Sequence, residues 1–359
     1  MISIAINPRE PHSAHLRETP DPTLEGENQV LIKGIRTGIC GTDTEINDGL
    51  YGEPPRGSDF LILGHESFGR VARIPHANSR FKVGDLVVRS VRRPCPQGCL
   101  GCRKGQSDTC LTGDFLECGI KGLHGSLTQY YLEEEEYLVP LPPELESVGV
   151  LTEPLSFVHK VTRRAKELLG SDLWPPRNAL VIGCGTIGIM QTLVLRSMGV
   201  DVEVVARSPS GNRKSKIVEQ VGARYVSSNG RPLGKILDPD LKAQLIVEAS
   251  GSASMVPEAM PFLARCGVLC LTSITGGHSN TQTSWDAINM DLVLGNKIVA
   301  GAVNSNITDF KEARRFLQTF EHLWPGLLEK MITRRVDFDT FPQAFERDPQ
   351  DIKVTVEIP

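Results

Sequence analysis

Four cysteines fall within a segment of sixteen residues, CPQGCLGCRKGQSDTC. Four thiolates this close together, in sequence rich in turn-forming residues, can close tetrahedrally around one zinc ion. Zinc with a complete protein shell has a structural role, because no position stays open for substrate. A redox role for the CLGC pair is the weaker alternative, because this segment lies outside the βαβ pattern that accompanies thioredoxin-like motifs. We therefore expect a structural zinc site formed by Cys95, Cys99, Cys102 and Cys110.

Three other segments contain side chains that could form a second metal site. GICGTD contains Cys40, LGHESFGRV contains His65 and Glu66, and LTEPLSF contains Glu153. One thiolate, one imidazole and one carboxylate would leave a fourth position open for water or substrate, as a catalytic zinc requires. Each residue also has a simpler explanation, since a lone cysteine is usually a small buried apolar residue and a His-Glu pair often belongs to a hydrogen-bonded turn. Spacing alone does not join these segments.

A glycine motif, ALVIGCGTIG, follows an apolar strand and opens an apolar helix. Glycines at these positions allow a tight turn, close approach of the backbone to a pyrophosphate, and close packing of helix on strand. The helix N-terminus then offers free N–H groups to the phosphates. The motif predicts a dinucleotide site that includes Gly183, Gly185, Thr186, Ile187 and Gly188.

The residues that follow the second predicted strand of this region indicate whether NAD or NADP binds. NAD-selective proteins usually place an Asp or Glu at the end of this strand, whereas this chain has Arg207 and Ser208 there, with Arg213 close behind. Basic side chains can hold a 2′-phosphate by charge-assisted hydrogen bonds. The sequence therefore favours NADP, with NAD as the alternative, unless these are ordinary surface bases.

The elements that would position these residues follow two patterns. Up to about residue 150, short β runs separated by turn residues predict an irregular, barrel-like β domain. From about residue 178 to 301, apolar strands alternate with helical stretches, which predicts a parallel sheet and an α/β fold. The proline-containing segment LWPPRN marks the change. We expect a catalytic domain of residues 1–173 and 305–359, and a nucleotide-binding domain of residues 174–304.

Composition narrows the classes of function. At 359 residues the chain exceeds the size of a single core, so two domains are expected. Its 39 basic and 43 acidic residues nearly balance, and the sequence has no dense basic stretch of the kind that binds nucleic acid. The longest apolar stretch is broken by glycines and polar residues, so no membrane span is expected. The first residues lack the apolar core of a secretory signal, which favours a cytoplasmic protein, and the acidic run at residues 133–136 is expected to be a solvated strand edge or turn.

In this order, the segments GICGTD, LGHESFGRV, the four-cysteine segment, the EP motif and GCGTIG resemble those of zinc-dependent medium-chain alcohol dehydrogenases. The resemblance spans nearly the whole chain. Within that superfamily, TGDFLECGIKGLHG, GVLTEPLS and VNSN are most similar to the archaeal-type glucose 1-dehydrogenases. The resemblance implies a GroES-like catalytic domain, a Rossmann domain, and a homodimer or homotetramer.

The same resemblance implies roles for individual residues. Cys40, His65 and Glu153 would ligate the catalytic zinc, with Glu66 as a carboxylate that binds or leaves the metal during turnover. Thr42 takes the position of a hydroxyl that relays a proton. Sugar hydroxyls would contact Glu117, Glu153 and Asn306, and the nicotinamide would contact Asn304. Two departures are the C-x3-C spacing, where C-x2-C is usual, and His159, where a glutamate is expected.

The function implied is oxidation of an aldose at C1 to the lactone, with reduction of NADP. D-glucose is the first expected substrate, followed by galactose and xylose. A polyol or secondary-alcohol dehydrogenase would use the same zinc and cofactor residues and is the alternative within enzymes. A catalytically inactive NADP-binding sensor is the alternative outside them.

Overall fold

The computed structural model describes residues 1–274 and 283–359. The chain divides into two compact units, the first of residues 1–157, 304–321 and 328–359, and the second of residues 158–303 and 322–327. The first change of unit falls inside the helix α3 (Thr152–Leu169), whereas the proline-containing segment comes after that helix. The domain limits expected from the sequence therefore stay a prediction.

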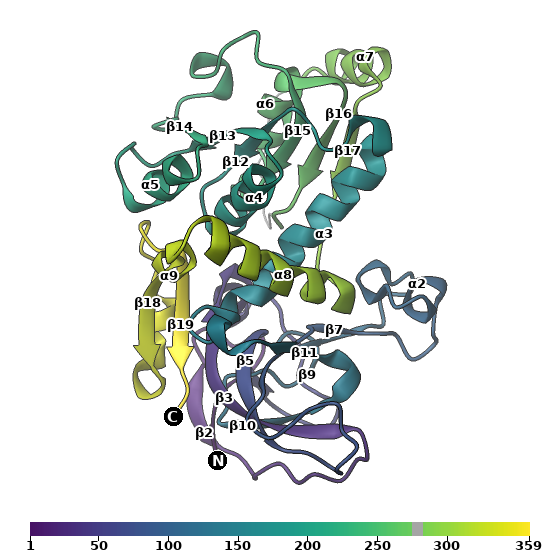
Figure 1. Ribbon diagram of the computed structural model, residues 1–359, viewed down its shortest axis with the longest axis vertical. Coiled ribbons are helices and arrows are strands. Elements are labelled where there is room, and N and C mark those ends of the chain that lie inside the picture. Colours follow the sequence, from purple (N-terminus) through teal and green to yellow (C-terminus); the bar gives the residue numbers. More distant parts are fainter. Residues whose placement is uncertain (275–282) are drawn as a thin grey trace. The chain divides into compact units, whose positions relative to one another are not determined.

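The first unit is built mainly of β-sheet (Figure 1). Its largest sheet has the order β11-β6-β5-β3-β19-β18, and β10 also pairs with β3. The bounds are β3 (Gln29–Ile39), β5 (Glu66–Arg73), β6 (Leu86–Arg89), β10 (Tyr130–Glu134), β11 (Leu138–Leu141), β18 (Ile332–Asp337) and β19 (Lys353–Glu357). The C-terminal strand β19 pairs antiparallel with β3, so the end of the chain completes the sheet of the first unit.

Two small sheets flank the metal-ligand segments of the first unit. One has the order β2-β1-β4, with β1 (Ile2–Ile6), β2 (His15–Glu18) and β4 (Leu61–Ile62). The other has the order β7-β8-β9, with β7 (Arg92–Arg93), β8 (Leu116–Cys118) and β9 (Gly122–Leu123). Between β7 and β8 the chain forms the lobe (residues 94–115) that contains the four cysteines, with α2 (Leu100–Arg103) and the short helix η1 (Ser107–Thr109).

The remaining helices of the first unit are α1 (Gly41–Asn47), α8 (Ile307–Leu323) and α9 (Leu327–Met331). The last two residues of α8 and the first residue of α9 are assigned to the second unit. Apolar side chains from both ends of the chain share one core. Ile4 and Ile6 of β1 pack in it with Val356 of β19 and Phe338. Burial of such side chains stabilises the fold by roughly 1.5–3 kcal/mol each.

The second unit is a six-stranded parallel sheet with the order β14-β13-β12-β15-β16-β17. The strands are β12 (Asn178–Ile182), β13 (Asp201–Ala206), β14 (Arg224–Ser227), β15 (Ala243–Glu248), β16 (Leu263–Leu271) and β17 (Ile298–Gly301). Counted along the chain within this unit, the order is 3-2-1-4-5-6, the order of the Rossmann fold. The α/β class and the parallel sheet predicted from the alternating pattern are confirmed.

Helices of the second unit lie between successive strands and pack on the sheet (Figure 1). They are α4 (Thr186–Ser197), α5 (Arg213–Gln220), α6 (Met255–Ala259) and α7 (Trp285–Gly295). The core strand β12 is buried along Ala179–Ile182, as expected for a strand covered on both faces. Within the described ranges, no helix combines the length and the apolar character needed to cross a bilayer.

The prediction for the acidic run at residues 133–136 was wrong for its first member. Glu133 is only 7 % exposed and forms ion pairs with Arg89 and Arg93. The carboxylate is buried because β10 alternates faces and places residue 133 on the inner one. A run of like charges in the sequence gave no sign of the two buried arginines that neutralise it.

Two glycines of the nucleotide motif allow α4 to start close to β12. Gly183 has a φ of 109°, which favours glycine, and a Cβ on Gly188 would lie 2.0 Å from the carbonyl oxygen of Gly183. Gly185, by contrast, has no neighbour within 4 Å of an added Cβ. The motif therefore contains two glycines, Gly183 and Gly188, that backbone conformation or packing requires, and one, Gly185, that neither requires.

We predict that Gly188→Ala lowers the free energy of unfolding of the second unit by about 2 kcal/mol, because the added methyl group forces helix and strand apart. Urea unfolding followed by circular dichroism measures this change. Gly185→Ala is the matched control and should cost less than half as much. Equal losses in both variants would show that close packing is not what selects glycine at position 188.

Candidate active site

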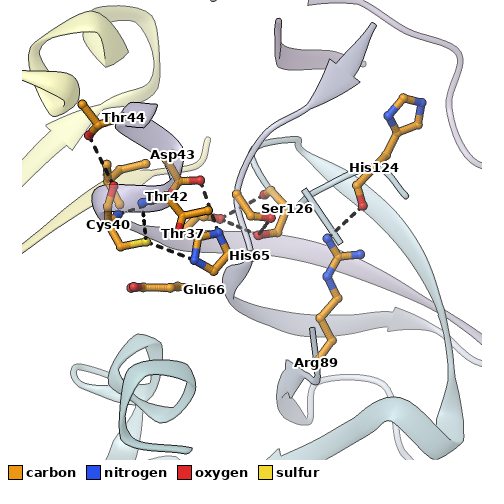
Figure 2. A network of polar contacts seen from close by, with 12 residues as sticks. Thr37, Cys40, Thr42, Asp43, Thr44, His65, Glu66, Arg89, His124 and Ser126 are labelled. Carbon is orange, nitrogen blue, oxygen red and sulfur yellow. Dashed lines mark hydrogen bonds and ion pairs between the residues drawn. The ribbon is translucent and has the colours of Figure 1, made fainter. Parts of the chain in front are cut away.

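The Cys40 thiol is held at the junction between β3 and α1 (Figure 2). Cys40 is the N-cap of α1, and its Sγ accepts a hydrogen bond from the backbone N–H of Thr42 at 3.3 Å. The backbone N–H of Cys40 donates to Asp43 Oδ2 at 3.0 Å, which completes a capping box. The segment GICGTD therefore starts a helix with a sulfur at its N-terminal end.

His65 lies next to this thiol, directly before β5. Its Nε2 is 3.2 Å from Cys40 Sγ, and its Nδ1 is 3.3 Å from Asp43 Oδ1, an ion-pair contact rather than an aligned hydrogen bond. Burial alone would raise the pKa of Asp43, but His65 and the N–H of Cys40 hold that pKa below its ordinary value. An ionised Asp43 orients the imidazole so that Nε2 faces the thiol, as carboxylates behind metal-ligating histidines do.

Glu66 is paired with a lysine from the C-terminal strand. Both Glu66 oxygens lie near Lys353 Nζ, at 2.5 and 2.6 Å, and the same Nζ donates to the carbonyl of Ile39 at 3.2 Å. Burial lowers the pKa of Lys353, but Glu66 and the other acidic groups around it together raise that pKa above its ordinary value. A Cβ on Gly38 would lie 2.0 Å from Glu66 Oε2, so the first glycine of GICGTD makes room for this carboxylate.

Glu153 reaches the same region from the first turn of α3. Ligand atoms of His65, Glu66 and Glu153 lie within 4.8 Å of one another, as do those of Cys40, Asp43 and His65. The two groups share His65. Burial raises the pKa of Glu153 to about 7, and the neighbouring Glu66 acts in the same direction while His65 opposes it. The residue as a whole is partly exposed, but its carboxyl is enclosed by protein.

This arrangement fits a zinc ion. A thiolate, an imidazole nitrogen and a carboxylate are ligands that zinc prefers in catalytic sites. Three carboxylates meet here, those of Asp43, Glu66 and Glu153, and a divalent cation would favour ionised Glu153. The structure thus brings together all four residues that the sequence assigned to the catalytic metal, in two overlapping groups. Thr42 lies at the same end of α1, in its first turn.

The four cysteines of the lobe also converge. Their Sγ atoms lie within 4.8 Å of one another, and all four are free thiols. Backbone N–H groups of Leu111 and Cys102 lower the pKa of Cys99 to about 6, which favours the thiolate that zinc binds. Leu111 N–H donates to Cys99 Sγ at 3.3 Å, and Cys95 N–H donates to Cys102 Sγ at 3.3 Å. Four thiols around one point in a turn-rich lobe fit a structural zinc site.

The predicted nucleotide residues follow β12 and β13 of the second unit. Gly183, Gly185, Thr186, Ile187 and Gly188 form the turn into α4 and its first residues. Arg207 and Ser208 directly follow β13, and Arg213 begins α5. Glu203, an acidic residue inside β13 that could otherwise serve an NAD ribose, pairs with Arg224 at 3.0 Å. The carboxyl end of β13 therefore carries basic and hydroxyl side chains, as the sequence predicted.

The residues assigned to sugar binding form a network in the first unit. Glu117 Oε1 accepts hydrogen bonds from Arg92 Nε at 3.0 Å and from Asn304 Nδ2 at 2.6 Å. Asn306 Oδ1 accepts from the backbone N–H of Thr308 at 2.9 Å and so caps α8, while its Nδ2 donates to Asp108 at 2.8 Å. Asn304 thus contacts Glu117, and its proposed contact with the nicotinamide stays a prediction, as does sugar binding by Asn306.

The chain combines a Rossmann unit with a β-rich unit. The β-rich unit contains the candidate catalytic zinc site around His65 and the four-cysteine site, and this combination defines a medium-chain dehydrogenase of the zinc type. The family model "Alcohol dehydrogenase GroES-like domain" matches residues 26–143, and "Glucose dehydrogenase C-terminus" matches residues 146–358. The chain is 39% identical to a glucose 1-dehydrogenase of Methanocella arvoryzae over 100% of this chain and 99% of the relative. It is 37% identical to that of Thermoproteus tenax, with the same coverage of both chains.

Solved structures agree with these matches. Haloferax mediterranei glucose dehydrogenase, in complex with NADP, zinc and gluconolactone, has a TM-score of 0.90 at 29% identity and covers 100% of this chain and 99% of that chain. Galactitol-1-phosphate dehydrogenase from Escherichia coli shares the fold, with a TM-score of 0.81 at 21% identity, over 100% of both chains. This chain belongs to the glucose 1-dehydrogenase family, and the resemblance inferred from its motifs is confirmed.

Sequence reasoning missed three residues that support the site: Asp43, Lys353 and Arg92. Asp43 had a local signal, because a carboxylate three residues after an N-cap is the mark of a capping box. Lys353 and Arg92 had none, since their carboxylate partners lie 287 and 25 residues away in the chain. Only the pairing of strands brings them into contact.

We predict that Lys353→Met lowers the free energy of unfolding by about 3–5 kcal/mol, because it leaves the Glu66 carboxylate buried without its partner. Chemical denaturation of the metal-loaded protein measures the change. The double variant Lys353→Met with Glu66→Gln should recover part of the loss. Arg315→Met, which breaks an exposed pair with Glu312, is the control and should cost less than about 1 kcal/mol. A small loss in Lys353→Met would contradict the role given to this pair.

Proposed function

We propose that this chain is a zinc-dependent, NADP-linked dehydrogenase that oxidises an aldose at C1 to the lactone. D-glucose is the best substrate in this proposal, with galactose and xylose as further ones. The observation that carries it is the 3.2 Å approach of Cys40 Sγ to His65 Nε2, backed by Asp43, in a chain that matches named glucose 1-dehydrogenases over its full length. The relative solved with NADP, zinc and gluconolactone supports the choice of cofactors and product class.

Cys40, His65 and Glu153 hold the catalytic zinc, which when bound supplies a Lewis acid that lowers the pKa of an alcohol. Asp43 keeps the imidazole in the orientation that turns Nε2 to the metal position. Lys353 neutralises Glu66 and holds it next to His65 and Glu153, from where it can exchange as a ligand. The four cysteines of the lobe hold the structural zinc.

Proton transfer and substrate binding fall to residues of the first unit. The Thr42 hydroxyl, half-buried in the first turn of α1, relays the proton released from the C1 hydroxyl. Glu117, Glu153 and Asn306 bind sugar hydroxyls. A buried carboxylate that loses a hydroxyl partner is left unpaired, so such a residue can discriminate strongly between epimers.

The carboxyl ends of β12 and β13 would hold NADP, which when bound would supply the acceptor for the hydride from C1. The glycine turn lets the backbone approach the pyrophosphate, and the N-terminus of α4 favours its charge. Arg207, Ser208 and Arg213 bind the 2′-phosphate. Arg207 and Arg213 are exposed and therefore free to meet an anion without losing a buried partner.

The enzyme is further proposed to be cytoplasmic and to form a homodimer or homotetramer. The edge strand β17 and the helix before it support self-association, because Val293 and Leu294 are 65% and 63% exposed and Val299 is 39% exposed. Apolar side chains on a sheet edge are covered in most stable proteins.

The proposed activity predicts reduction of NADP when D-glucose is added, with slower turnover of D-galactose and D-xylose and little of sorbitol. Initial rates, measured with metal content before and after a strong chelator, test this. Cys40→Ser should lose at least ~10²-fold in kcat/KM. Cys266→Ser, at an exposed cysteine outside both metal groups, should keep wild-type rates. Turnover of sorbitol but of no aldose would replace the proposal by a polyol dehydrogenase, and tight NADPH binding without any turnover would favour a sensor.

The cofactor proposal predicts that Arg207→Ala raises the KM for NADP by roughly 10-fold or more and leaves the KM for NAD nearly unchanged, since only NADP has the 2′-phosphate. Arg224→Ala, which removes a 70% exposed arginine from the next strand, is the matched control. Equal effects of Arg207→Ala on both cofactors would assign this arginine to a general surface role.

A further inference from the structure

We propose that Arg92 is a positioning residue that fixes the Glu117 carboxylate for sugar binding, and that the four-cysteine lobe holds this pair in place. The inference rests on the proposed function, which assigns Glu117 to the sugar. It adds Arg92 to the residues that act in sugar recognition, and it gives the four-cysteine lobe a role in recognition besides metal binding and stability.

The first step is the geometry of the pair. Arg92 and Glu117 are direct partners in the antiparallel ladder of β7 and β8. Two guanidinium nitrogens, Nε and Nη2, lie 3.0 and 2.9 Å from the same carboxylate oxygen, Oε1. Asn304 Nδ2 donates to that oxygen as well, at 2.6 Å. Two hydrogen bonds and one ion-pair contact to the same oxygen fix the carboxylate in one orientation.

The second step concerns the other oxygen. Oε2 of Glu117 has no hydrogen-bond partner within residues 1–274 and 283–359, although the side chain is only 12% exposed. An ionised carboxylate oxygen in such a place has free acceptor capacity. It is therefore set to accept a hydroxyl hydrogen, while Oε1 is used by the protein.

The third step is how Arg92 itself is held. Its guanidinium lies 3.6 Å from the centroid of the Phe115 ring, and its Nη1 donates to the carbonyl of Asp108 at 3.4 Å. Asp108 belongs to the lobe, between Cys102 and Cys110. Through its side chain the same Asp108 accepts from Asn306 Nδ2 at 2.8 Å. One residue of the lobe thus contacts both Arg92 and Asn306.

Together these contacts make a rigid frame around Glu117. Phe115 and Asp108 both belong to the four-cysteine lobe (residues 94–115). A metal ion bound by the four cysteines would therefore order the two residues that hold Arg92 against Glu117. Arginine suits this position because its planar guanidinium places two nitrogens beside one carboxylate oxygen and its face stacks on an aromatic ring. Lysine would supply the charge without this planar group.

The test is steady-state kinetics of the full-length, zinc-loaded enzyme with NADP and either D-glucose or D-galactose. Arg92→Gln should raise the KM for glucose roughly ten-fold and bring the ratio of kcat/KM for the two epimers closer to one, with kcat changed less than about three-fold. Arg92→Lys should recover part of the KM. In the double variant Arg92→Gln with Glu117→Gln, the loss should equal that of Glu117→Gln alone, because Arg92 acts through Glu117.

Arg93 provides the matched control. It is the next residue of β7, it is also buried, it pairs with the Glu133 carboxylate, and it lies 3.9 Å from the Tyr137 ring centroid. Arg93→Gln should lower thermal stability at least as much as Arg92→Gln and leave KM and epimer preference unchanged. Asp108→Ala, with zinc content measured, should raise the KM for glucose while four thiols still bind metal.

The outcomes separate this inference from the proposed function. An active wild type whose KM and epimer ratio are unchanged in both Arg92→Gln and Arg92→Lys overturns the role of Arg92 and leaves the function standing. Equal kinetic losses in Arg92→Gln and Arg93→Gln also overturn it, since they indicate general destabilisation. If the wild type oxidises no aldose, the proposed function fails and this inference fails with it. If Arg92→Gln does not fold, Arg92→Lys decides by the same KM criterion.

Discussion

The candidate active site depends on the register of one strand, β3, with its two neighbours. Its pairing with β5 places Gly38 opposite Glu66, so that Cys40 and His65, which follow and precede these residues, come within 3.2 Å through their Sγ and Nε2 atoms. Its pairing with β19 places Ile39 opposite Val354 and brings Lys353 to Glu66. A shift of either pairing by one residue would turn these side chains to the other face of the sheet.

Charge explains why so many ionisable groups can be buried at this place. Asp43, Glu66 and Glu153 meet one lysine and one imidazole, and burial of carboxylates without compensation is costly. Lys353 neutralises Glu66, whereas burial raises the pKa of Glu153 to about 7. A zinc ion at the thiolate and imidazole would supply the remaining positive charge, which links metal binding to the stability of the site.

The short strand β7 contains two adjacent arginines that have different roles. Arg92 and Arg93 point to opposite sides, as residues of a strand do, and each meets a buried carboxylate and an aromatic ring. Glu133 is shared by two arginines and lies in the interior of the sheet, so that pair serves stability. Glu117 keeps one oxygen without a partner in the described chain, as its proposed role in sugar recognition requires.

The sequence by itself determined the features that are local in the chain. The four-cysteine segment, the glycine turn after an apolar strand and the basic residues after β13 each lie within a short stretch, so spacing and residue type predict them. The fold class followed from periodicity for the same reason. The order of the motifs also identified the family. Through this resemblance the sequence assigned Cys40, His65, Glu66 and Glu153 to one metal site, although their spacing alone could not join them. Only the tertiary structure decided which groups neutralise the buried charges: Lys353 for Glu66, Arg92 for Glu117, and Arg89 with Arg93 for Glu133. These pairs form across strands, and strand pairing depends on the packing of the whole sheet, which no local pattern encodes.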